Sequence, residues 1–404
     1  MRQGVESLKG KSIVVGITGG ISAYRACDIV RILVQDGATV HVIMTKAAME
    51  FITPLTLQTL SQNPVITDLF DLISESRIGH ISLAQGADLV LVAPATANII
   101  GKFAAGIADD MLSTLYLATE APIVVAPAMN EKMYAAAVVR ENIGKLRDRG
   151  VMVIDPGWGE LACGDVGWGR LAPVEQIVEA ARAALSSKIL QGKKVLVTAG
   201  PTAEPIDPVR DITNRSSGKM GFALAKIARR LGAEVVLVSG PVSLEDPYFI
   251  KTLRVKTGEE MHGAVMENLE STDLLIKAAA VADFRPSQKA KEKIKKDTFG
   301  GTVHLERNID ILASVGVKSP RPFLVGFAAE TEDVRENALR KMEEKNIDAI
   351  VTNDVSRADI GFSSDYNEVT VIFRDGTEQA VPKNEKDKVA LQILEMIAGR
   401  LSGR

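Results

Sequence analysis

The sequence predicts an α/β protein of two domains, each built on a doubly wound parallel sheet covered by helices. The chain has 404 residues, which at about 150 residues per domain gives two or three domains. Short aliphatic and β-branched runs alternate with stretches typical of helices, the pattern of parallel sheets with helices on both faces. The same opening, a β-branched run followed by a glycine turn, occurs near residue 10 and again near residue 192.

The predicted strands of the first domain begin with residues 10–15, which lead into the glycine turn Gly16-Ile17-Thr18-Gly19-Gly20. A helical stretch follows, and then a Gly-Ala strand at 37–44. Further strands are predicted at 88–93 and 123–126. Because these strands are short, apolar and separated by helical stretches, we expect them to lie parallel in one sheet.

The second domain repeats this order. Its first predicted strand, 192–197, leads into Thr198-Ala199-Gly200, and a second Gly-Ala strand follows at 232–238. Three more apolar strands are predicted at 273–276, 323–326 and 349–351. Residues 368–373, followed by Asp375-Gly376, predict a strand that enters a hairpin turn.

The distribution of charge predicts where the domains meet. Up to Leu190 the chain has 16 basic and 19 acidic residues, whereas from Gln191 onward it has 32 of each. An alanine-rich helical stretch at 174–190 precedes this change. We therefore expect domains at residues 1–188 and 189–404.

Composition excludes several classes of protein. A net charge of −3 is too balanced for a dedicated nucleic-acid binder, and no run of about 18 apolar residues predicts a membrane span. The N-terminus lacks the apolar stretch of a signal peptide. Two cysteines, Cys27 and Cys163, disfavour a disulfide framework and indicate a cytoplasmic protein. The four histidines have no zinc-site spacing.

Ligands of open α/β sheets bind beyond the carboxyl ends of the strands, so the loops there are candidate sites. The first glycine turn opens a helix and would suit an anion. Its spacing is not the G-x-G-x-x-G of dinucleotide-binding proteins, and a plain tight turn remains the alternative. Residues 93–98 and 126–130 place small and polar side chains at two other strand ends, where a flat ring could lie against the backbone.

Two reactive side chains stand out in the first half. His80 begins a predicted helix, where it is either a catalytic group or a solvated cap. Cys163 lies in residues 157–170, which hold five glycines and both tryptophans of the chain. This composition is typical of a flexible active-site flap with two apolar anchors, on which a cysteine is a candidate reactive group. Cys27 and His41 are predicted to be packing residues.

Two segments of the second half are candidates for binding phosphate. Ser217-Gly218-Lys219 is not a P-loop, because Thr213 and Met220 stand where Gly and Ser/Thr are required. Residues 289–296 contain five lysines. They are either a solvated charge run, a nucleic-acid patch, or a loop that closes on a triphosphate and offsets its developing charge.

The motifs of the first half resemble the flavin-dependent phosphopantothenoylcysteine decarboxylases. They are Gly-Gly-Ile-Ser-Ala-Tyr at 19–24, His80 before Ile-Ser-Leu-Ala, Pro-Ala-Thr-Ala-Asn at 94–98, Pro-Ala-Met-Asn at 127–130 and Ala-Cys-Gly-Asp at 162–165. The resemblance implies a flavodoxin-like domain. Its FMN would be held by Gly19, Gly20, Ser22, Thr45, Thr96 and Asn98.

The same resemblance implies the chemistry of this half. Oxidation of the substrate thiol by the flavin would give a thioaldehyde, which accepts the electron pair left when CO₂ departs. The flavin would then reduce the resulting ene-thiol, so that no net redox change occurs. His80 is expected to be the base near the flavin. Met129 and Asn130 are expected to bind the substrate, and Asn130 is expected to contact the carboxylate of the substrate. Cys163 is expected to donate the last proton.

The motifs of the second half resemble the phosphopantothenate–cysteine ligases, at 200–210, 213–221, 278–284, 293–296 and 326–331. The resemblance implies a Rossmann-like domain that uses CTP and Mg²⁺ to activate 4′-phosphopantothenate as an acyl-cytidylate, which the amine of L-cysteine attacks. Asn214 is expected to handle the acyl-cytidylate and Lys293 to be catalytic. The other implied substrate- and nucleotide-binding residues are Arg210, Ala278, Ala279, Asp283, Ile309, Asp310, Ile311, Leu312, Phe327, Lys341 and Lys345.

One position departs from the ligase pattern, because Ile309 stands where the family has proline and so loses proline's fixed φ. The order of the two halves is that of the bifunctional coenzyme A biosynthesis proteins, and the resemblance covers nearly the whole chain. It implies a homo-oligomer with trimeric flavin domains and dimeric ligase domains, sometimes built into dodecamers. The sequence does not decide between CTP and ATP, nor does it give the Mg²⁺ ligands.

Three alternative functions are disfavoured by the sequence. Another flavin-dependent decarboxylase or a prenyl-flavin synthase is disfavoured by the Ala-Cys-Gly-Asp segment and the ligase-like half. A chain with one degenerate half is disfavoured because each motif keeps its reactive residue. A non-enzymatic nucleotide- or RNA-binding protein is disfavoured by the balanced charge.

Overall fold

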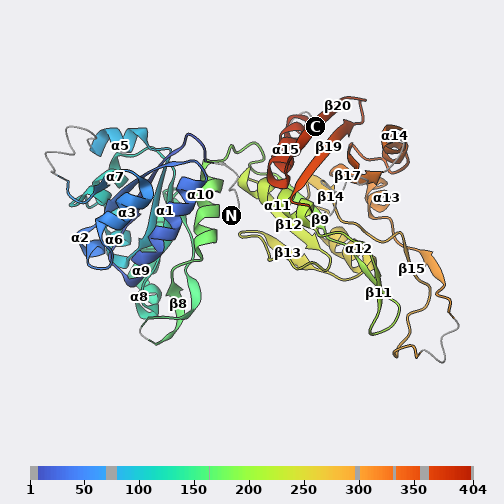
Figure 1. Ribbon diagram of the computed structural model, residues 1–404, viewed down its shortest axis with the longest axis horizontal. Coiled ribbons are helices and arrows are strands. Elements are labelled where there is room, and N and C mark those ends of the chain that lie inside the picture. Colours follow the sequence, from blue (N-terminus) through green and yellow to red (C-terminus); the bar gives the residue numbers. More distant parts are fainter. Residues whose placement is uncertain are drawn as a thin grey trace. The chain divides into compact units, whose positions relative to one another are not determined.

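The computed structural model describes residues 8–69, 80–162, 164–295, 301–330, 334–354 and 364–401. The chain divides into two compact units, Met1–Ser186 and Ser187–Arg404 (Figure 1). Lys188 Nζ donates a hydrogen bond to the carbonyl of Arg230 at 3.0 Å, and the amide of Leu190 donates one to the carbonyl of Leu231 at 3.0 Å. The residues that follow the first unit therefore pack on the second.

A six-stranded parallel sheet forms the centre of the first unit, in the order β3-β2-β1-β4-β5-β6. Its strands are β1 (Ser12–Ile17), β2 (Thr39–Met44), β3 (Val65–Ile66), β4 (Leu89–Ala95), β5 (Ile123–Pro127) and β6 (Met152–Val153). Without the two-residue edge strand β3, this is the 2-1-3-4-5 order of flavodoxin-like folds. The parallel sheet predicted for this half is confirmed.

Helices cover both faces of this sheet because its strands are apolar on both faces (Figure 1). In β1, Ile13 and Val15 pack on one side and Val14 on the other. The first face is covered by α1 (Ala26–Gln35), α3 (Pro54–Ser61) and α10 (Val174–Leu185). The second is covered by α5 (His80–Gly86), α6 (Ala97–Ala105), α7 (Met111–Ala118) and α9 (Ala137–Asp148). Short helices η1 (Ile21–Arg25), α2 (Lys46–Met49) and α8 (Glu131–Ala135) follow β1, β2 and β5.

The second unit has an eight-stranded sheet in the order β13-β12-β9-β14-β17-β18-β19-β20. Its strands are β9 (Lys194–Ala199), β12 (Glu234–Ser239), β13 (Lys251–Arg254), β14 (Leu274–Lys277), β17 (Phe323–Glu330), β18 (Ala349–Asp354), β19 (Tyr366–Phe373) and β20 (Glu378–Glu385). The first six are parallel in the 3-2-1-4-5-6 order of Rossmann folds. The last two form the predicted antiparallel hairpin.

The helices of the second unit also divide between two faces. One face is covered by α11 (Lys219–Arg230) and α15 (Lys386–Leu401). The other is covered by α12 (Gly258–Glu267), α13 (Ile311–Gly316) and α14 (Val334–Glu344). Among the described residues, three antiparallel strand pairs lie outside the main sheets: β7 (Gly157–Glu160) with β8 (Val166–Arg170), β10 (Ala203–Pro205) with β11 (Asp211–Thr213), and β15 (Phe284–Pro286) with β16 (Leu305–Arg307).

Each sheet contains one point where the winding reverses. β1 and β4 are neighbours, and the helices α1 and α6 that follow them cover opposite faces. β9 and β14 are neighbours as well, and the next helices after them, α11 and α13, also cover opposite faces. Such a reversal leaves a crevice at the carboxyl ends of the two strands, where open α/β sheets bind ligands.

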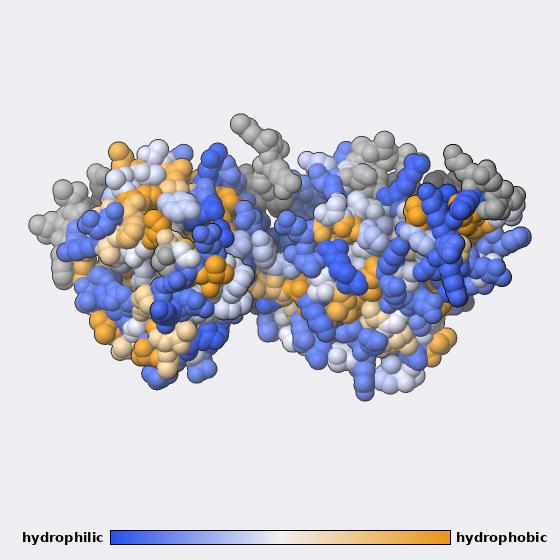
Figure 2. All heavy atoms as spheres, turned by 90° about the horizontal axis from the view of Figure 1, so that it is seen from below, coloured by the Kyte–Doolittle hydropathy of each residue, from blue (hydrophilic) through white to orange (hydrophobic). Residues whose placement is uncertain are grey.

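On the face shown in Figure 2, hydrophilic and apolar side chains are mixed in both units. None of the helices that the structure describes has the length and apolar character needed to cross a membrane. Cys27 is partly buried against the core between the first sheet and helices α1, α3 and α10, as predicted for a packing residue.

Candidate active sites

A cavity of about 990 Å³ opens at the carboxyl ends of β1, β2 and β4 in the first unit. Four of the residues predicted to hold FMN line it: Gly19, Thr45, Thr96 and Asn98. It is also lined by Thr18 of the glycine turn and by Met133. The other lining residues are ones that the sequence did not single out, namely Met44, Lys46, Ala47, Thr67, Asp68, Leu69, Lys102, Asp109, Asp110, Met111 and Leu112. Two of the three loops expected to form a site, the glycine turn and residues 93–98, therefore converge at this cavity, whereas residues 126–130 do not line it.

Thr18 fixes the two loops on either side of the winding reversal. Its buried hydroxyl donates a hydrogen bond to the carbonyl of Pro94 at 2.8 Å and accepts one from the amide of Thr96 at 3.0 Å. Thr96 is the N-cap of α6, and its own side chain makes no capping hydrogen bond. The α6 N-terminus is thus held at the cavity with a hydroxyl group beside it.

Gly19 packs closely against Ala47 of α2 beside the cavity. A Cβ atom at this position would lie 2.4 Å from the Cβ and 2.6 Å from the carbonyl carbon of Ala47. Only glycine therefore lets the turn after β1 approach α2. Thr45, the N-cap of α2, accepts a hydrogen bond from the amide of Ala48 at 3.3 Å and donates its own amide to Ile17 at 3.0 Å.

One charged cluster borders the same cavity. Lys102 Nζ lies 2.6 Å from a carboxylate oxygen of Asp109 and 2.8 Å from one of Asp110. Desolvation lowers the pKa of Lys102, but its hydrogen bonds to the two carboxylates outweigh this, and the pKa is raised. The Asp110 side chain also accepts the amide of Ser113 at 2.8 Å, in a capping box that begins α7.

The remaining residues predicted for the first site lie elsewhere or outside the described residues. Gly20 is the N-cap of η1, and Ser22 lines a neighbouring cavity of about 720 Å³ together with Trp158 and Arg170. The backbone of His80 begins α5, but its side chain is not described. Cys163 lies outside the described residues.

The segment around Cys163 was expected to be a flexible loop anchored by two tryptophans, and its described residues correct that expectation. They form the β7–β8 hairpin, in which Trp158 pairs with Trp168, and the two indoles are 62% and 51% exposed. The hairpin packs through its glycines instead. A Cβ at Gly167 would lie 2.1 Å from the Glu131 side chain, and one at Gly169 would lie 2.2 Å from the Met129 carbonyl.

This packing places the hairpin over Asn130. The amide of Met129 donates a hydrogen bond to the carbonyl of Gly169 at 2.9 Å, and Asn130 Nδ2 lies 3.5 Å from a carboxylate oxygen of Asp165. Asn130 is the N-cap of α8, the helix whose Met133 lines the first cavity. The structure thus brings the two predicted substrate-binding residues, Met129 and Asn130, next to the segment that carries Cys163.

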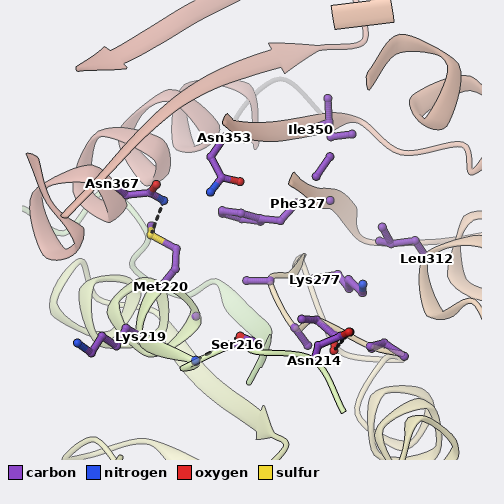
Figure 3. Close-up of a pocket in the computed structure, with 18 of the residues that line it drawn as sticks. Asn214, Ser216, Lys219, Met220, Lys277, Leu312, Phe327, Ile350, Asn353 and Asn367 are labelled. Carbon is purple, nitrogen blue, oxygen red and sulfur yellow. Dashed lines mark hydrogen bonds between the residues drawn. The ribbon is translucent and has the colours of Figure 1, made fainter. Parts of the chain in front are cut away.

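A second cavity, of about 560 Å³, lies at the winding reversal of the second unit (Figure 3). Eight predicted residues line it: Asn214, Ala278, Ala279, Asp283, Leu312, Phe327, Lys341 and Lys345. Asn214 Nδ2 donates a hydrogen bond to the carbonyl of Ala280 at 3.0 Å, which ties the loop after β11 to the loop after β14. In the view of Figure 3, Lys277 lies between Phe327 and Asn214.

The N-terminus of α11 opens into this cavity. Gly218, its N-cap, has a φ of 76°, and a Cβ there would lie 2.9 Å from Val242 and 3.3 Å from the backbone of Gly200. The Ser216 hydroxyl accepts the Gly218 amide at 3.3 Å, and both residues line the cavity. The segment is not a P-loop, yet it presents small residues and a helix N-terminus, which favour an anion.

Lys277 is the main residue of this site that the sequence did not indicate. It ends β14, where it pairs with Thr198 and Gly326. Desolvation, followed by the charge of Lys345, lowers the pKa of Lys277 to about 8, and Asp310 opposes the shift. With Lys341 and Lys345 it places three amines around one cavity. Lys219 and Lys386 also line the cavity. Lys219 Nζ lies 2.6 Å from a carboxylate oxygen of Asp365, and Lys386 Nζ donates a hydrogen bond to the carbonyl of Ser364 at 2.6 Å.

The loop with the family departure at Ile309 is held from both sides. Asn308 donates its backbone amide to the carbonyl of Asp283 at 2.8 Å and its side-chain amide to the buried Glu204 at 3.0 Å. The Ile309 amide donates a hydrogen bond to Asn308 Oδ1 at 2.9 Å, which a proline could not do.

The two residues after Ile309 take different places. Asp310 caps α13 by accepting the Ala313 amide at 3.1 Å, and it lies 2.8 Å from Lys345 Nζ. Ile311 is 1% exposed and packs in the core, so its side chain does not reach the cavity.

Arg210 and Lys293 do not line the second cavity. Both side chains are exposed, and the two segments lie against each other, with Arg210 Nη2 donating a hydrogen bond to the carbonyl of Ile294 at 3.3 Å. Among the residues that the structure describes, no three Cys, His, Asp or Glu side chains come together in a way that could hold a metal ion.

Comparison with known proteins agrees with these two units. Residues 2–186 match the family model described as Flavoprotein, and residues 190–401 match the DNA/pantothenate metabolism flavoprotein C-terminal domain. The coenzyme A biosynthesis bifunctional protein CoaBC of Vibrio cholerae serotype O1 is 50% identical over 396 residues, which cover 97% of this chain and 99% of that protein. The protein of the same name from Bacillus subtilis strain 168 is 48% identical over 395 residues, with 97% of each chain covered.

A solved crystal structure of the C-terminal domain of a CoaBC protein is 43% identical and covers 54% of this chain and 100% of that chain, with a TM-score of 0.47. The family assignment follows from the two family matches and the full-length identities. The chain belongs to the family of coenzyme A biosynthesis bifunctional proteins CoaBC.

Proposed function

We propose that this chain catalyses two successive steps of coenzyme A biosynthesis. The second unit joins L-cysteine to 4′-phosphopantothenate with consumption of CTP. The first unit then removes the carboxylate of the joined cysteine and yields 4′-phosphopantetheine. The observation that carries the proposal is the pair of cavities, one at each winding reversal. Four of the six residues selected for FMN line the first, and eight of the residues selected for the ligase line the second.

The first cavity fits FMN. Gly19 lets the turn after β1 lie against Ala47 of α2 at the edge of the cavity, and the α6 N-terminus at Thr96 favours the phosphate group. When bound, FMN supplies a reversible two-electron oxidation of the substrate thiol. Thr18 holds the two loops in register, Asn130 binds the substrate carboxylate, His80 serves as the base and Cys163 gives the last proton.

The second cavity suits a triphosphate. Lys277, Lys341 and Lys345 provide positive charge, and the α11 N-terminus at Gly218 faces the same space. Asn214 handles the acyl-cytidylate. Mg²⁺ arrives with CTP as part of the substrate, since this ion is commonly held by nucleotide phosphates and only one or two carboxylates.

We also propose that the chain works as a cytoplasmic homo-oligomer. Large apolar side chains of the first unit are exposed at Tyr24, Trp158, Val166 and Trp168. Exposed apolar groups of this size often mark a surface that another subunit covers. Trimers of the first unit and dimers of the second are the proposed contacts.

Two measurements test the proposal. The purified chain should be yellow with a flavin spectrum, and a colourless protein that takes up no FMN would count against the first activity. Pyrophosphate release should require 4′-phosphopantothenate and be faster with CTP than with ATP. Release that is independent of 4′-phosphopantothenate would refute the second activity.

A further inference from the structure

Asp207 is a buried carboxylate that lies outside both cavities. It sits in the turn between β10 and β11 and is 1% exposed. Its Oδ1 accepts the amides of Val209 and Arg210, both at 2.8 Å, and its Oδ2 accepts the amide of Ile294 at 3.1 Å. Burial raises the pKa of Asp207, but these backbone donors outweigh it and leave the pKa below its ordinary value. The carboxylate is therefore charged at neutral pH.

These hydrogen bonds join two segments that are far apart in the sequence. Ile294 belongs to the lysine-rich segment and directly follows Lys293, whereas Arg210 belongs to the turn itself. The Ala290 amide donates to the carbonyl of Ile206 at 3.0 Å, and Arg210 Nη2 donates to the carbonyl of Ile294 at 3.3 Å. The lysine-rich segment is thus attached to the turn at residue 290 and again at residue 294.

A segment rich in lysines needs such an attachment before it can act. Its ammonium groups repel one another, and a free chain loses conformational entropy when it is ordered on a ligand. A backbone that is already fixed avoids most of this loss when the ligand binds. Asp207 is suited to the task because its acceptors are buried and hold main-chain donors rather than the lysine side chains.

We propose that Asp207 is a positioning residue for the ligation step. Through the Ile294 amide and the turn backbone at Arg210, it holds the lysine-rich segment, and with it Lys293, on the β10–β11 turn. The inference rests on the proposed ligase activity and on Lys293 acting in it. In this proposal the turn between β10 and β11 orients Lys293, which lies 86 residues after Asp207 in the sequence.

The first test is Asp207→Asn in the full-length chain. An asparagine side chain has one oxygen and one NH₂ group. It can therefore accept either the Val209 and Arg210 amides or the Ile294 amide, but not all three. Pyrophosphate release with CTP and 4′-phosphopantothenate should fall roughly tenfold to hundredfold, mainly in kcat. Asp211→Asn is the matched control, because Asp211 is an exposed neighbour that pairs with Lys256 at 3.0 Å and should retain activity within about twofold of wild type. Full activity of Asp207→Asn would overturn the proposal.

A double-mutant cycle separates positioning from a general loss of structure. If Asp207 acts through Lys293, the Asp207→Asn/Lys293→Gln chain should be no slower than Lys293→Gln alone. If the two substitutions instead reduce the rate by the product of their separate factors, the proposal is overturned. Ile294→Pro removes the same hydrogen bond from the other partner and should reproduce the loss even if Asp207→Asn folds poorly.

Limited trypsin digestion tests the attachment without relying on activity. Cleavage after Lys291, Lys293 and Lys295 should be several times faster in Asp207→Asn than in wild type or Asp211→Asn, and equal rates would overturn the proposal. This readout keeps two failures apart. A wild-type chain that releases no pyrophosphate refutes the proposed ligase, whereas unchanged cleavage refutes the role of Asp207.

Discussion

Gly19→Ala is the substitution that should most sharply affect the first site. The added Cβ would lie 2.4 Å from Ala47 Cβ, 2.6 Å from its carbonyl carbon and 2.7 Å from its oxygen. Ordinary contact begins at 3.4 Å, so α2 must retreat by about 1 Å. The obstacle is backbone rather than a flexible side chain, and Thr45, which caps this helix, must move with it.

The size of the effect follows from the collision. Overpacking of this kind costs about 1–3 kcal/mol. If the binding of FMN must restore the native position of Thr45, that cost appears in the affinity, where each 1.4 kcal/mol is a factor of ten. The dissociation constant for FMN should therefore rise roughly fivefold to hundredfold.

Fluorescence titration of flavin-free protein with FMN measures this constant. Gly101→Ala is the matched control, because Gly101 lies within α6 and its Cβ would meet only Asn142 Nδ2 at 3.8 Å. The control should bind FMN as wild type does. If Gly19→Ala also binds FMN with wild-type affinity, the cavity at β1, β2 and β4 is not the flavin site.

Three further predictions concern single side chains. Thr18→Val leaves a buried amide and a buried carbonyl without their hydroxyl partner and should lower the free energy of unfolding of the first unit by about 1–3 kcal/mol in urea denaturation; an unchanged midpoint would contradict the role of Thr18. The pKa of Lys277 is about 8 and a triphosphate favours its charged form, so affinity for CTP should fall as the pH rises from 7 to 9. Lys277→Met should weaken binding at pH 7 and flatten this profile, and an equally steep profile would contradict the assignment. Cys163→Ser should retain its flavin spectrum but form no 4′-phosphopantetheine, whereas full decarboxylation would refute the proton-donor role.

The sheets were predictable because their signals are local. The predicted parallel strands are short apolar runs, whereas the short edge strands β3 and β6 and the polar strand β13 were missed. Asp375-Gly376 marks the turn between β19 and β20. The carboxyl-end loops could be located for the same reason, and they supply Gly19, Thr45, Thr96 and Asn98 to one cavity. Roles that came from the family resemblance, such as those of His80 and Cys163, remain predictions.

Residues that act over long sequence distances could not be found this way. Lys277 ends an apolar strand, and only the pairing of β14 with β9 and β17 places it at the cavity. Asp207 and Glu204 hold partners 87 and 104 residues away, and nothing near them in the sequence marks those contacts.

The β7–β8 hairpin, by contrast, was not predicted, because the glycines of residues 157–170 indicated a loop. Its glycines at 157, 159, 167 and 169 alternate along two strands, with Trp158 and Trp168 between them. Because alternate residues of a strand share a face, this pattern leaves one face of the hairpin free of side chains. Gly167 and Gly169 approach α8 and the loop before it through that face.

The measurement that most directly tests the central claim is the mass of the product formed by the full-length chain. It is supplied with 4′-phosphopantothenate, L-cysteine, CTP and Mg²⁺ and with no other enzyme. The account predicts 4′-phosphopantetheine, with one pyrophosphate and one CO₂ released for each molecule formed. Accumulation of 4′-phosphopantothenoylcysteine without CO₂, or no reaction at all, would contradict the claim that one chain performs both steps.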